Sequence, residues 1–469
     1  MKKVLAMLLV FAMIASFAAC GSSSNSSTVN EESSAVSSDK VSSSTEEESS
    51  TGEKFSGSIS IACSSQEAKA LQEVLKSYNE QEDVDEVTID PITVESVGDF
   101  EGLMTSWISS DTLPDMYISQ VGSLQQSYAA NGYLLPLTEY GFLDRLVAGD
   151  TELIKYDGDD YAVPMNQSIS VIYVNNAALK EAGIEIDETN YPNTWDEFVD
   201  ILDQLVAAGV QYPFSLAGQD ASAVTALPFQ YIYQVVYGAN PNWYADMLKG
   251  ENGAAWNDEL FLGMFDKYGE LLKYVSEDVL GVSKDERLAR SVTGESPIYV
   301  DTSGAMPGIR ELDPEADVIM LPSCFVDDPA DQTIISSFDS AVSITTGAEK
   351  KGNVELCVDF LDYLTTVEGS TIFNNITGYV PTIVDCESEV DPAFDIVLSI
   401  LNKGELPNSP MLSREWIPGI KEVMKNGCQN WLAGEDPKSV ADTIQAEQDR
   451  LEEASPDWVE DFLANYNYK

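Results

Sequence analysis

The sequence predicts an α/β protein with more than one domain, and three observations support this prediction. Short apolar strands alternate with amphipathic helices from residue 58 onward, which is typical of a largely parallel sheet with helical crossovers. The chain has 469 residues, and domains average about 150 residues, so two or three domains are expected. Apolar residues make up 44% of the sequence, which is enough for large hydrophobic cores.

The first 20 residues have the pattern of a secretion signal. Lys2 and Lys3 precede an apolar run over residues 4–15, and small residues lead to Cys20. The run is too short to span a membrane, which takes about 20 apolar residues, so residues 1–19 are expected to be a signal peptide. The join resembles a bacterial lipobox, which implies that Cys20 is acylated. Ordinary cleavage near Ala19 would instead leave Cys20 as a free thiol.

The segment after Cys20 is rich in Ser and Glu up to residue 53. It cannot bury enough apolar surface to fold, so residues 20–53 are expected to form a lipidated cysteine with a disordered tether. A flexible chain of this length spans on the order of 30 Å. We therefore expect the body to be held at the extracellular face of the cell membrane, with the lipid anchor as its only membrane contact.

The body begins with a regular alternation of elements. Residues 58–62 alternate in polarity and predict a strand, and residues 66–81 predict a helix with one apolar face. Residues 87–94 predict a second strand. After a further helical stretch, residues 116–118 predict a third strand, so the start of the body should form a parallel sheet.

Three later helices carry clear boundary signals. Thr194 and Glu197 form a capping box, an apolar stripe follows, and Gly209 ends that helix. A second helix is predicted over residues 353–365, with Cys357 on its apolar stripe as a core residue. A third helix begins at Asp436-Pro437 and runs through Leu451, with proline at a favourable first position.

Composition and motifs exclude several function classes. The formal net charge is −54, so the chain should repel nucleic acid and anionic lipid surfaces. The sequence contains no histidine, which excludes imidazole bases, Ser-His-Asp triads and histidine zinc sites. It contains neither CxxC nor a phosphate-binding glycine motif. The run from Asp157 to Asp160 predicts a polar turn, because it lacks the rest of a calcium loop. No cofactor, metal or catalytic residue is therefore expected.

Several short motifs follow one another in a fixed order along residues 54–469: Leu113-Pro114-Asp115, Gly132 to Leu137, Tyr156 to Pro164, Ile172 to Asn175, Thr194-Trp195, and Gly378 to Pro381. This order resembles that of the extracellular solute-binding proteins of ABC importers, the family 1 proteins of the maltose- and oligosaccharide-binding type. At residues 294–304 the chain departs from the family pattern. Pro297-Ile298 replaces the usual Ala-Met, and no tryptophan follows.

The resemblance implies a two-lobe periplasmic-binding-protein-like fold of type II with three inter-lobe crossings, near residues 163–167, 338–342 and 378–382. The N-lobe would comprise residues 54–164 and 343–378, and the C-lobe residues 168–338 and 383–469. It also implies a non-enzymatic function, in which the protein captures a small solute, expected to be an oligosaccharide, and delivers it to ABC transporter permease subunits. A monomer is expected.

Sugars present flat apolar faces rimmed by hydroxyl groups, which suit aromatic rings together with amide or carboxylate groups. The candidates are residues at predicted strand ends, at crossings and in irregular segments, and we expect Trp243 and Tyr244 to lie in an Asn-Pro-Asn loop. Each candidate also has a structural interpretation, since most tryptophans pack in cores and most polar loop residues are only solvated. The candidate ligand residues are Gln66, Gln120, Asn166, Trp243, Tyr244, Asp301, Asp339, Tyr379 and Trp416.

Other functions remain open at this stage. The acidic balance would also suit a cationic solute such as a peptide or a polyamine. A surface lipoprotein that binds a ligand and signals, without importing it, would have the same sequence features. A secreted glycan hydrolase with two carboxylates is disfavoured by the order of the motifs.

Overall fold

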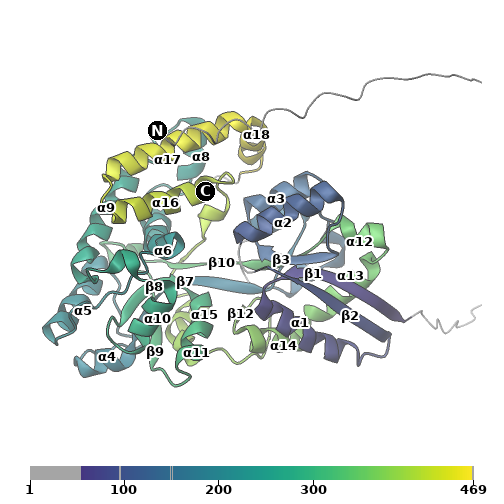
Figure 1. Cartoon of the computed structure of the whole chain (residues 1–469), viewed down its shortest axis with the longest axis horizontal. Helices are drawn as coiled ribbons and strands as arrows, with labels where there is room; N and C mark the ends of the chain where they lie inside the picture. The colour runs from purple at the N-terminus through teal and green to yellow at the C-terminus, as the bar shows by residue number, and fades with distance from the viewer. Residues whose placement is uncertain (1–53, 95–96, 148, 150, 467–469) are drawn as a thin grey trace, which may run out of the picture. The chain divides into compact units, whose positions relative to one another are not determined.

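The computed structural model describes residues 54–94, 97–147, 149 and 151–466. Within these residues the strands form a five-stranded sheet, a six-stranded sheet and a two-stranded hairpin (Figure 1). The sequence predictions for the signal peptide, Cys20 and the tether fall on residues 1–53 and lie outside the described residues. Each large sheet with the helices packed on it forms one lobe; the lobe of the five-stranded sheet is called the first lobe, and the other the second lobe.

The five-stranded sheet has the order β2-β1-β3-β11-β6. Strand β1 pairs in parallel with β2 and β3, which confirms the parallel start predicted from the sequence. Strand β11 joins later in the chain and runs antiparallel to β3 and β6. The strands are β1 (Phe55–Cys63), β2 (Val84–Thr93), β3 (Met116–Gln120), β6 (Val163–Pro164) and β11 (Ser340–Ile344).

Alternate residues of the first-lobe strands enter two separate cores, because successive side chains of a strand point to opposite faces. Ile61 and Met116 pack on one face with side chains of α1, α13 and α14. Ala62 and Tyr117 pack on the other face with side chains of α2 and α3. The helices of this lobe are α1 (Ser65–Tyr78), α2 (Val97–Ser110), α3 (Ser123–Ala130), α12 (Thr346–Lys351), α13 (Val354–Leu364) and α14 (Val367–Thr377).

The six-stranded sheet is organised around one buried strand, β7 (Asn166–Asn175). Gln167 pairs with both Phe338 of β10 and Val380 of β12, and Ile172 pairs with both Val300 of β8 and Leu321 of β9. Both edges of β7 are therefore occupied over most of its length. Its partners are β8 (Ile298–Thr302), β9 (Val318–Pro322), β10 (Ile334–Phe338) and β12 (Val380–Pro381), and β13 (Asn408–Ser409) pairs with β10.

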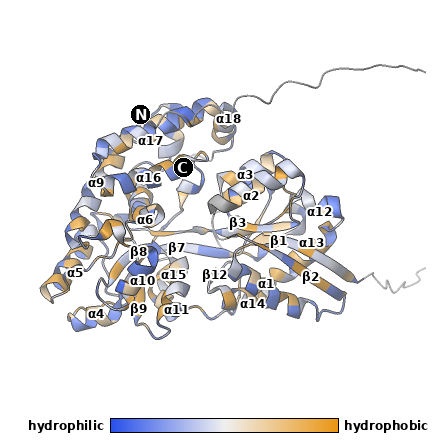
Figure 2. Cartoon of the chain, in the orientation of Figure 1, coloured by the Kyte–Doolittle hydropathy of each residue, from blue (hydrophilic) through white to orange (hydrophobic). Residues whose placement is uncertain are grey.

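The helices of the second lobe surround this sheet and share one large core. Figure 2 shows hydrophobic and hydrophilic positions alternating along these helices, as expected where one face covers a core. The helices are α4 (Asn176–Glu181), α5 (Trp195–Ala207), α6 (Ala221–Tyr231), α7 (Tyr237–Ala239), α8 (Trp243–Lys249), α9 (Glu259–Leu271), α10 (Lys284–Val292), α11 (Met306–Leu312), α15 (Asp395–Lys403), α16 (Ile420–Leu432), α17 (Pro437–Ala454) and α18 (Pro456–Asn465).

The three helices with boundary signals are confirmed as α5, α13 and α17. The capping box of α5 differs in one detail. The Thr194 hydroxyl accepts from the Glu197 amide at 3.3 Å, but the Glu197 carboxylate accepts from the amide of Asn193 at 2.7 Å instead of the amide of Thr194. A complete capping box occurs at the start of α1, between Ser64 and Glu67.

The polar turn predicted over Asp157 to Asp160 is confirmed at Asp157-Gly158, which form the tip of a hairpin between β4 (Lys155–Tyr156) and β5 (Asp159–Asp160), whereas its last two residues belong to β5. Asp157 and Gly158 have φ values of 50° and 88°, as a two-residue turn of this hand requires. The five cysteines after the tether are free thiols, and Cys357 is buried as predicted. Among the described helices, none is both long and apolar enough to cross a membrane.

Candidate functional site

The two sheets meet where single residues join their strands. Met165 separates β6 from β7, and Asp339 separates β10 from β11. Asn166 ties the two connections together: its carbonyl accepts from the Asp339 amide at 3.0 Å, and its side-chain oxygen accepts from the Ser340 amide at 2.7 Å. These bonds fix the position of Asp339 between the lobes.

Polar side chains from both lobes gather around Asp339 and form the junction group, defined as Glu67, Gln120, Asp339, Tyr379, Arg414 and Lys421. The Asp339 carboxylate accepts from Gln120 at 3.1 Å and from Arg414 at 2.8 Å. Lys421 donates to the Gln120 side-chain oxygen at 3.1 Å. The Tyr379 hydroxyl lies 3.5 Å from the Glu67 carboxylate. Gln120 ends a first-lobe strand and Lys421 lies in the first turn of a second-lobe helix, so the group links the lobes directly.

The charges in the junction group perturb one another. Burial, together with the nearby Lys425 and Arg414 cations, lowers the pKa of Lys421 to about 8. Burial also raises the pKa of the Glu67 carboxyl, although Ser64 donates hydrogen bonds to it. Arg414 donates a second bond to the Phe338 carbonyl. The group offers ammonium, guanidinium, amide, phenol and carboxylate functions, which suit a ligand rich in hydroxyl groups.

Five of the nine candidates from the sequence lie at this junction: Gln66, Gln120, Asn166, Asp339 and Tyr379. Gln66 donates to the Thr377 carbonyl at 2.8 Å, beside the segment that carries Tyr379. Asn166 is only 6% exposed, and its carbonyl and side-chain oxygens hold the main chain of the connection. A predicted position at a strand end or crossing was thus a useful indication that a residue lies near the junction of the two lobes.

Trp243 and Tyr244 are not brought to the junction. The sequence analysis placed them in a loop, but they form the first turn of α8, after the turn at Asn240-Pro241-Asn242. Trp243 is 1% exposed, and its indole N–H donates to Asp258 at 2.8 Å. The Tyr244 hydroxyl accepts from the Ile417 amide at 2.8 Å. Both rings pack in the core of the second lobe.

Trp416 and Asp301 are also engaged by the fold. The Trp416 ring is 2% exposed and donates to the Tyr237 hydroxyl at 2.8 Å, whereas its carbonyl accepts from Ser123 of the first lobe at 2.8 Å. Asp301 forms an ion pair with the buried Arg287 and accepts from the Thr302 amide at 2.8 Å. The Trp416 main chain, but not its ring, therefore reaches the junction.

A cavity of about 660 Å³ lies between residues of the first and second lobes. One wall is made by α3 and the β4–β5 hairpin of the first lobe, and the other by Glu415 and α18 of the second lobe. Four aromatic side chains line it, namely Tyr156, Trp458, Phe462 and Tyr466. The sequence analysis missed α18; its aromatic residues at intervals of four were a signal that could have pointed to this wall.

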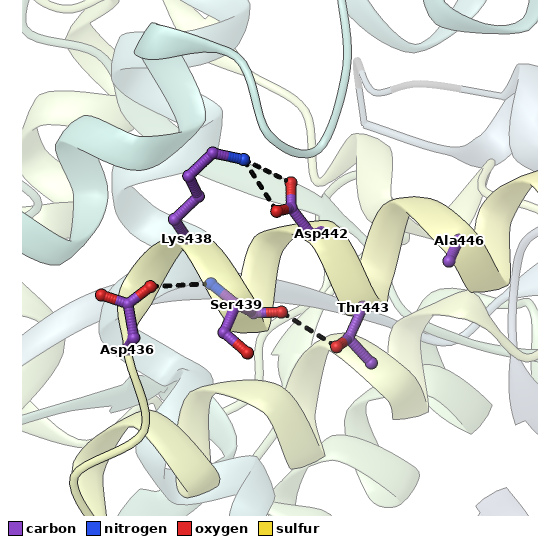
Figure 3. Close-up of a pocket in the computed structure, with 6 residues that line it drawn as sticks. All are labelled: Asp436, Lys438, Ser439, Asp442, Thr443 and Ala446. Carbon is purple, nitrogen blue, oxygen red and sulfur yellow. Dashed lines mark hydrogen bonds and ion pairs between the residues drawn. The ribbon is translucent and has the colours of Figure 1, made fainter.

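A second hollow lies on the outer face of α17 (Figure 3). Lys438 and Asp442 form an ion pair at 2.7 Å, one turn apart, and Asp436 caps the helix by accepting from the Ser439 amide at 3.0 Å. Thr443 donates to the Ser439 carbonyl at 2.9 Å. These bonds lie within the helix and its N-cap, and Asp442 also accepts from Asn257 at 2.8 Å, so the polar side chains of the hollow are engaged by the fold. No group of three metal-binding side chains occurs among the described residues.

Comparison with known proteins agrees with this architecture. The family model of bacterial extracellular solute-binding proteins matches residues 64–371. The chain is 22% identical to a multiple sugar-binding protein of Streptococcus mutans, over 61% of this chain and 67% of the relative. It is 24% identical to an sn-glycerol-3-phosphate-binding periplasmic protein of Shigella flexneri, over 60% of this chain and 64% of the relative. The chain thus spans about two thirds of the length of these relatives.

Solved structures share the fold. A chitin oligosaccharide binding protein superposes with a TM-score of 0.70 at 22% identity, covering 85% of this chain and 99% of the other. A Bacillus licheniformis sugar transporter protein in complex with stachyose superposes with a TM-score of 0.67 at 19% identity, covering 84% and 100%. At these identities the superposition shows the fold alone, which is the two-lobe fold that the resemblance implied.

Proposed function

Because the chain belongs to the bacterial extracellular solute-binding protein family, we propose that it captures an oligosaccharide between its two lobes and hands it to ABC transporter permease subunits. The observation that carries this proposal is the cavity between α3 and α18. A volume of about 660 Å³ falls in the range of ligand pockets, about 300–1,000 Å³. Its walls combine aromatic rings with carboxylate and amide groups, which match the faces and hydroxyls of a sugar.

The mechanism follows from the placement of the cavity. A ligand that contacts both walls gains interactions only when the lobes are close together, so binding favours the closed state. Hinge closure of this kind is a known behaviour of periplasmic binding proteins. We infer that residues 54–164 and 343–378 move as one lobe and residues 168–338 and 383–469 as the other. The connections at Met165 and Asp339 would then act as hinges.

The relatives bind two classes of solute according to their names, sugars and a phosphate ester, and the charges that line the cavity favour the sugars. The lining contains five carboxylates, from Glu152, Asp157, Glu415, Asp457 and Asp461, and one lysine, Lys155. A phosphate ester would be repelled there, since phosphate recognition relies on Arg and Lys side chains. We therefore expect a neutral or cationic sugar and no binding of glycerol phosphate.

A thermal-shift screen of residues 54–469 tests the proposal. The panel contains chitin oligosaccharides, raffinose, stachyose, sn-glycerol 3-phosphate, short peptides and polyamines. A ligand at 100 times its dissociation constant stabilises by about 2.7 kcal/mol, which gives a clear rise in melting temperature. We expect a rise with one sugar series and recovery of that sugar uncleaved. A rise with peptides or polyamines alone would contradict the sugar assignment, and a cleaved sugar would contradict a binding function.

The proposal includes a lipid anchor at Cys20 and a monomeric state. Metabolic labelling with an alkyne-bearing fatty acid should label the wild-type chain and not the Cys20→Ala variant. An unlabelled wild-type chain would rule out acylation. Light scattering of the purified body should give the mass of one chain.

A further inference from the structure

The C-terminal helix α18 forms a wall of the inter-lobe cavity, although it lies outside residues 64–371, which the family model matches. Trp458 and Phe462 lie four residues apart on α18 and therefore share one face of the helix, and Tyr466 follows directly after the end of the helix. The Trp458 and Phe462 rings stack with centroids 5.2 Å apart and an interplanar angle of 17°. The Phe462 and Tyr466 centroids are also 5.2 Å apart. The result is a continuous aromatic row.

The aromatic row packs on the core of the second lobe through Phe462. Phe462 meets the ring of the buried Tyr244 edge-on, with centroids 5.9 Å apart. Tyr244 in turn contacts Trp416, and its hydroxyl accepts from the Ile417 amide. Phe462 thus anchors the row to the core, while Trp458 remains only partly buried and faces the cavity.

The opposite wall of the cavity, the β4–β5 hairpin, is held in place by hydrogen bonds to α3. Tyr156 lies beside the tight turn of the β4–β5 hairpin. The side-chain nitrogen of Gln126 on α3 donates to the carbonyls of Glu152 and Lys155, at 3.0 Å and 3.1 Å, which binds the hairpin to the first lobe. The hairpin and α18 line the same cavity and face each other across it. Burial, and then the carboxylates of Asp461 and Asp157, raise the pKa of Tyr156.

Two residues of the cavity lining lie close in sequence to members of the junction group. Ser123 lines the cavity and donates to the carbonyl of Trp416. Glu415 also lines it and follows Arg414, which binds Asp339. A solute whose end lies at the junction group therefore has an adjoining space for further units, bounded by aromatic rings and carboxylates.

We propose that Trp458 of α18 and Tyr156 of the hairpin form a subsite for the outer units of a linear, uncharged or cationic oligosaccharide, so that these residues determine the preferred chain length. This inference rests on the proposed function. Aromatic rings would pack on the apolar faces of the outer units, and the surrounding carboxylates would accept hydrogen bonds from their hydroxyls. The two residues belong to different lobes, so a long chain bridges them, whereas a single sugar unit at the junction does not.

Isothermal titration with two length series tests the subsite. The probes are chitin oligosaccharides of increasing length, from two units upward, and the series galactose, raffinose and stachyose. In the wild type, affinity should increase with chain length in the series that binds. Trp458→Leu keeps an apolar side chain without the ring and should weaken binding of the longest member about fivefold, with little change for the shortest. Trp458→Phe should restore most of the loss.

Tyr156→Ala examines the other wall independently, in case the Trp458→Leu variant does not fold. It should show the same dependence on length. Tyr140→Ala is the matched control, since Tyr140 is 44% exposed in the first lobe and does not line the cavity. It should bind every member as the wild type does.

The outcomes distinguish the two proposals. Equal losses for short and long members, no loss in either cavity variant, or wild-type affinity that does not change with length would overturn the subsite and leave sugar capture intact. If no member of either series binds the wild type, oligosaccharide capture is overturned, and the subsite with it.

Discussion

At the scale of single residues, Asp301 shows how a carboxylate near a strand end can serve the fold. The Arg287 side chain that pairs with it is 3% exposed, and the guanidinium carbon lies 4.4 Å from the centroid of the Tyr299 ring. That ring stacks on Tyr173 of β7 with centroids 4.7 Å apart. A buried cation without its partner carries a large desolvation cost, so Asp301 stabilises this arrangement.

Asp301→Ala should lower the free energy of unfolding by about 2 kcal/mol, because Asp301 is partly exposed and some of the cost of an unpaired Arg287 is relieved by water. Urea unfolding followed by tryptophan fluorescence measures this change. The affinity for the solute should stay the same. Asp327→Ala is the control, since Asp327 pairs with Lys267 but is 86% exposed, and it should cost less than about 0.5 kcal/mol. Similar losses in the two variants would contradict the argument.

The lowered pKa of Lys421 predicts how the stability of the protein depends on pH. This pKa is about 8 in the folded chain, against about 10.4 for an exposed lysine. Between these values the unfolded chain binds more protons, so stability should increase as pH rises from 8 to 10.5. Below pH 8 both states are protonated and the full cost of burying the charge is present.

Lys421→Met should remove this dependence and be more stable than the wild type at pH 7, by about 2 kcal/mol. Free energies of unfolding at pH 7, 8, 9 and 10 give the difference between the two chains, in which the titration of other groups cancels. A constant difference over this range would show that Lys421 titrates normally.

At the scale of elements, the local sequence predicted those helices, caps and turns that are determined by residues close together in the chain. The apolar stripe of α5 and its Thr194 cap are determined within one helix, and so is the proline at the start of α17. The turn at Asp157-Gly158 likewise depends on two adjacent residues. These elements were therefore predictable from sequence.

Features that depend on distant residues were not predictable in this way. The four partners of β7 come from residues 298 to 381, and nothing within residues 166–175 specifies them. The residues before Trp243, Asn-Pro-Asn, are typical of a loop, but contacts with Asp258, Trp256 and Phe261 bury the Trp243 side chain. The sequence analysis proposed the candidate site where position along the chain was informative, at strand ends and crossings. It was missed at α18, where the tertiary fold brings a terminal helix to the cavity.

The close approach of Gly122 to the second lobe predicts that a larger residue at this position would displace α3. Gly122 precedes α3 with φ of 133°, and a Cβ atom there would lie 2.5 Å from the Arg414 carbonyl oxygen. Gly122→Ala should therefore push α3 away from the 411–416 segment and cost about 3 kcal/mol of stability, from the contact and the backbone conformation together. It should also weaken solute binding, because both cavity walls shift apart.

Gly132→Ala is the matched control for Gly122→Ala. Gly132 has φ of 71°, but a Cβ atom there has no neighbour within 4 Å. It should cost about 1 kcal/mol through its backbone conformation alone and leave binding unchanged. Thermal unfolding and titration calorimetry give both quantities. Equal effects at the two glycines would mean that the approach of α3 to Arg414 is unimportant.

At the scale of the whole molecule, the lobes are connected by more than the chain itself. Gln120 binds both Asp339 and Lys421, and Ser123 donates to the Trp416 carbonyl. Each bond contributes about 1 kcal/mol if it forms only when the lobes are together. The unliganded protein is then biased toward the conformation that the ligand also favours, which lowers the cost of closure on binding.

Removing these bonds should therefore open the unliganded protein. The double variant Gln120→Ala, Ser123→Ala removes all three bonds, and a loss of about 3 kcal/mol shifts the ratio of closed to open molecules by roughly 100-fold. Small-angle scattering without ligand should give a larger radius of gyration than in the wild type, and this readout does not depend on ligand contacts. Thr443→Ala loses a hydroxyl bond within α17 (Figure 3) and should leave the radius unchanged. If the double variant also keeps the wild-type radius, these bonds do not hold the lobes together, and closure depends on the connections at Met165 and Asp339 and on the solute.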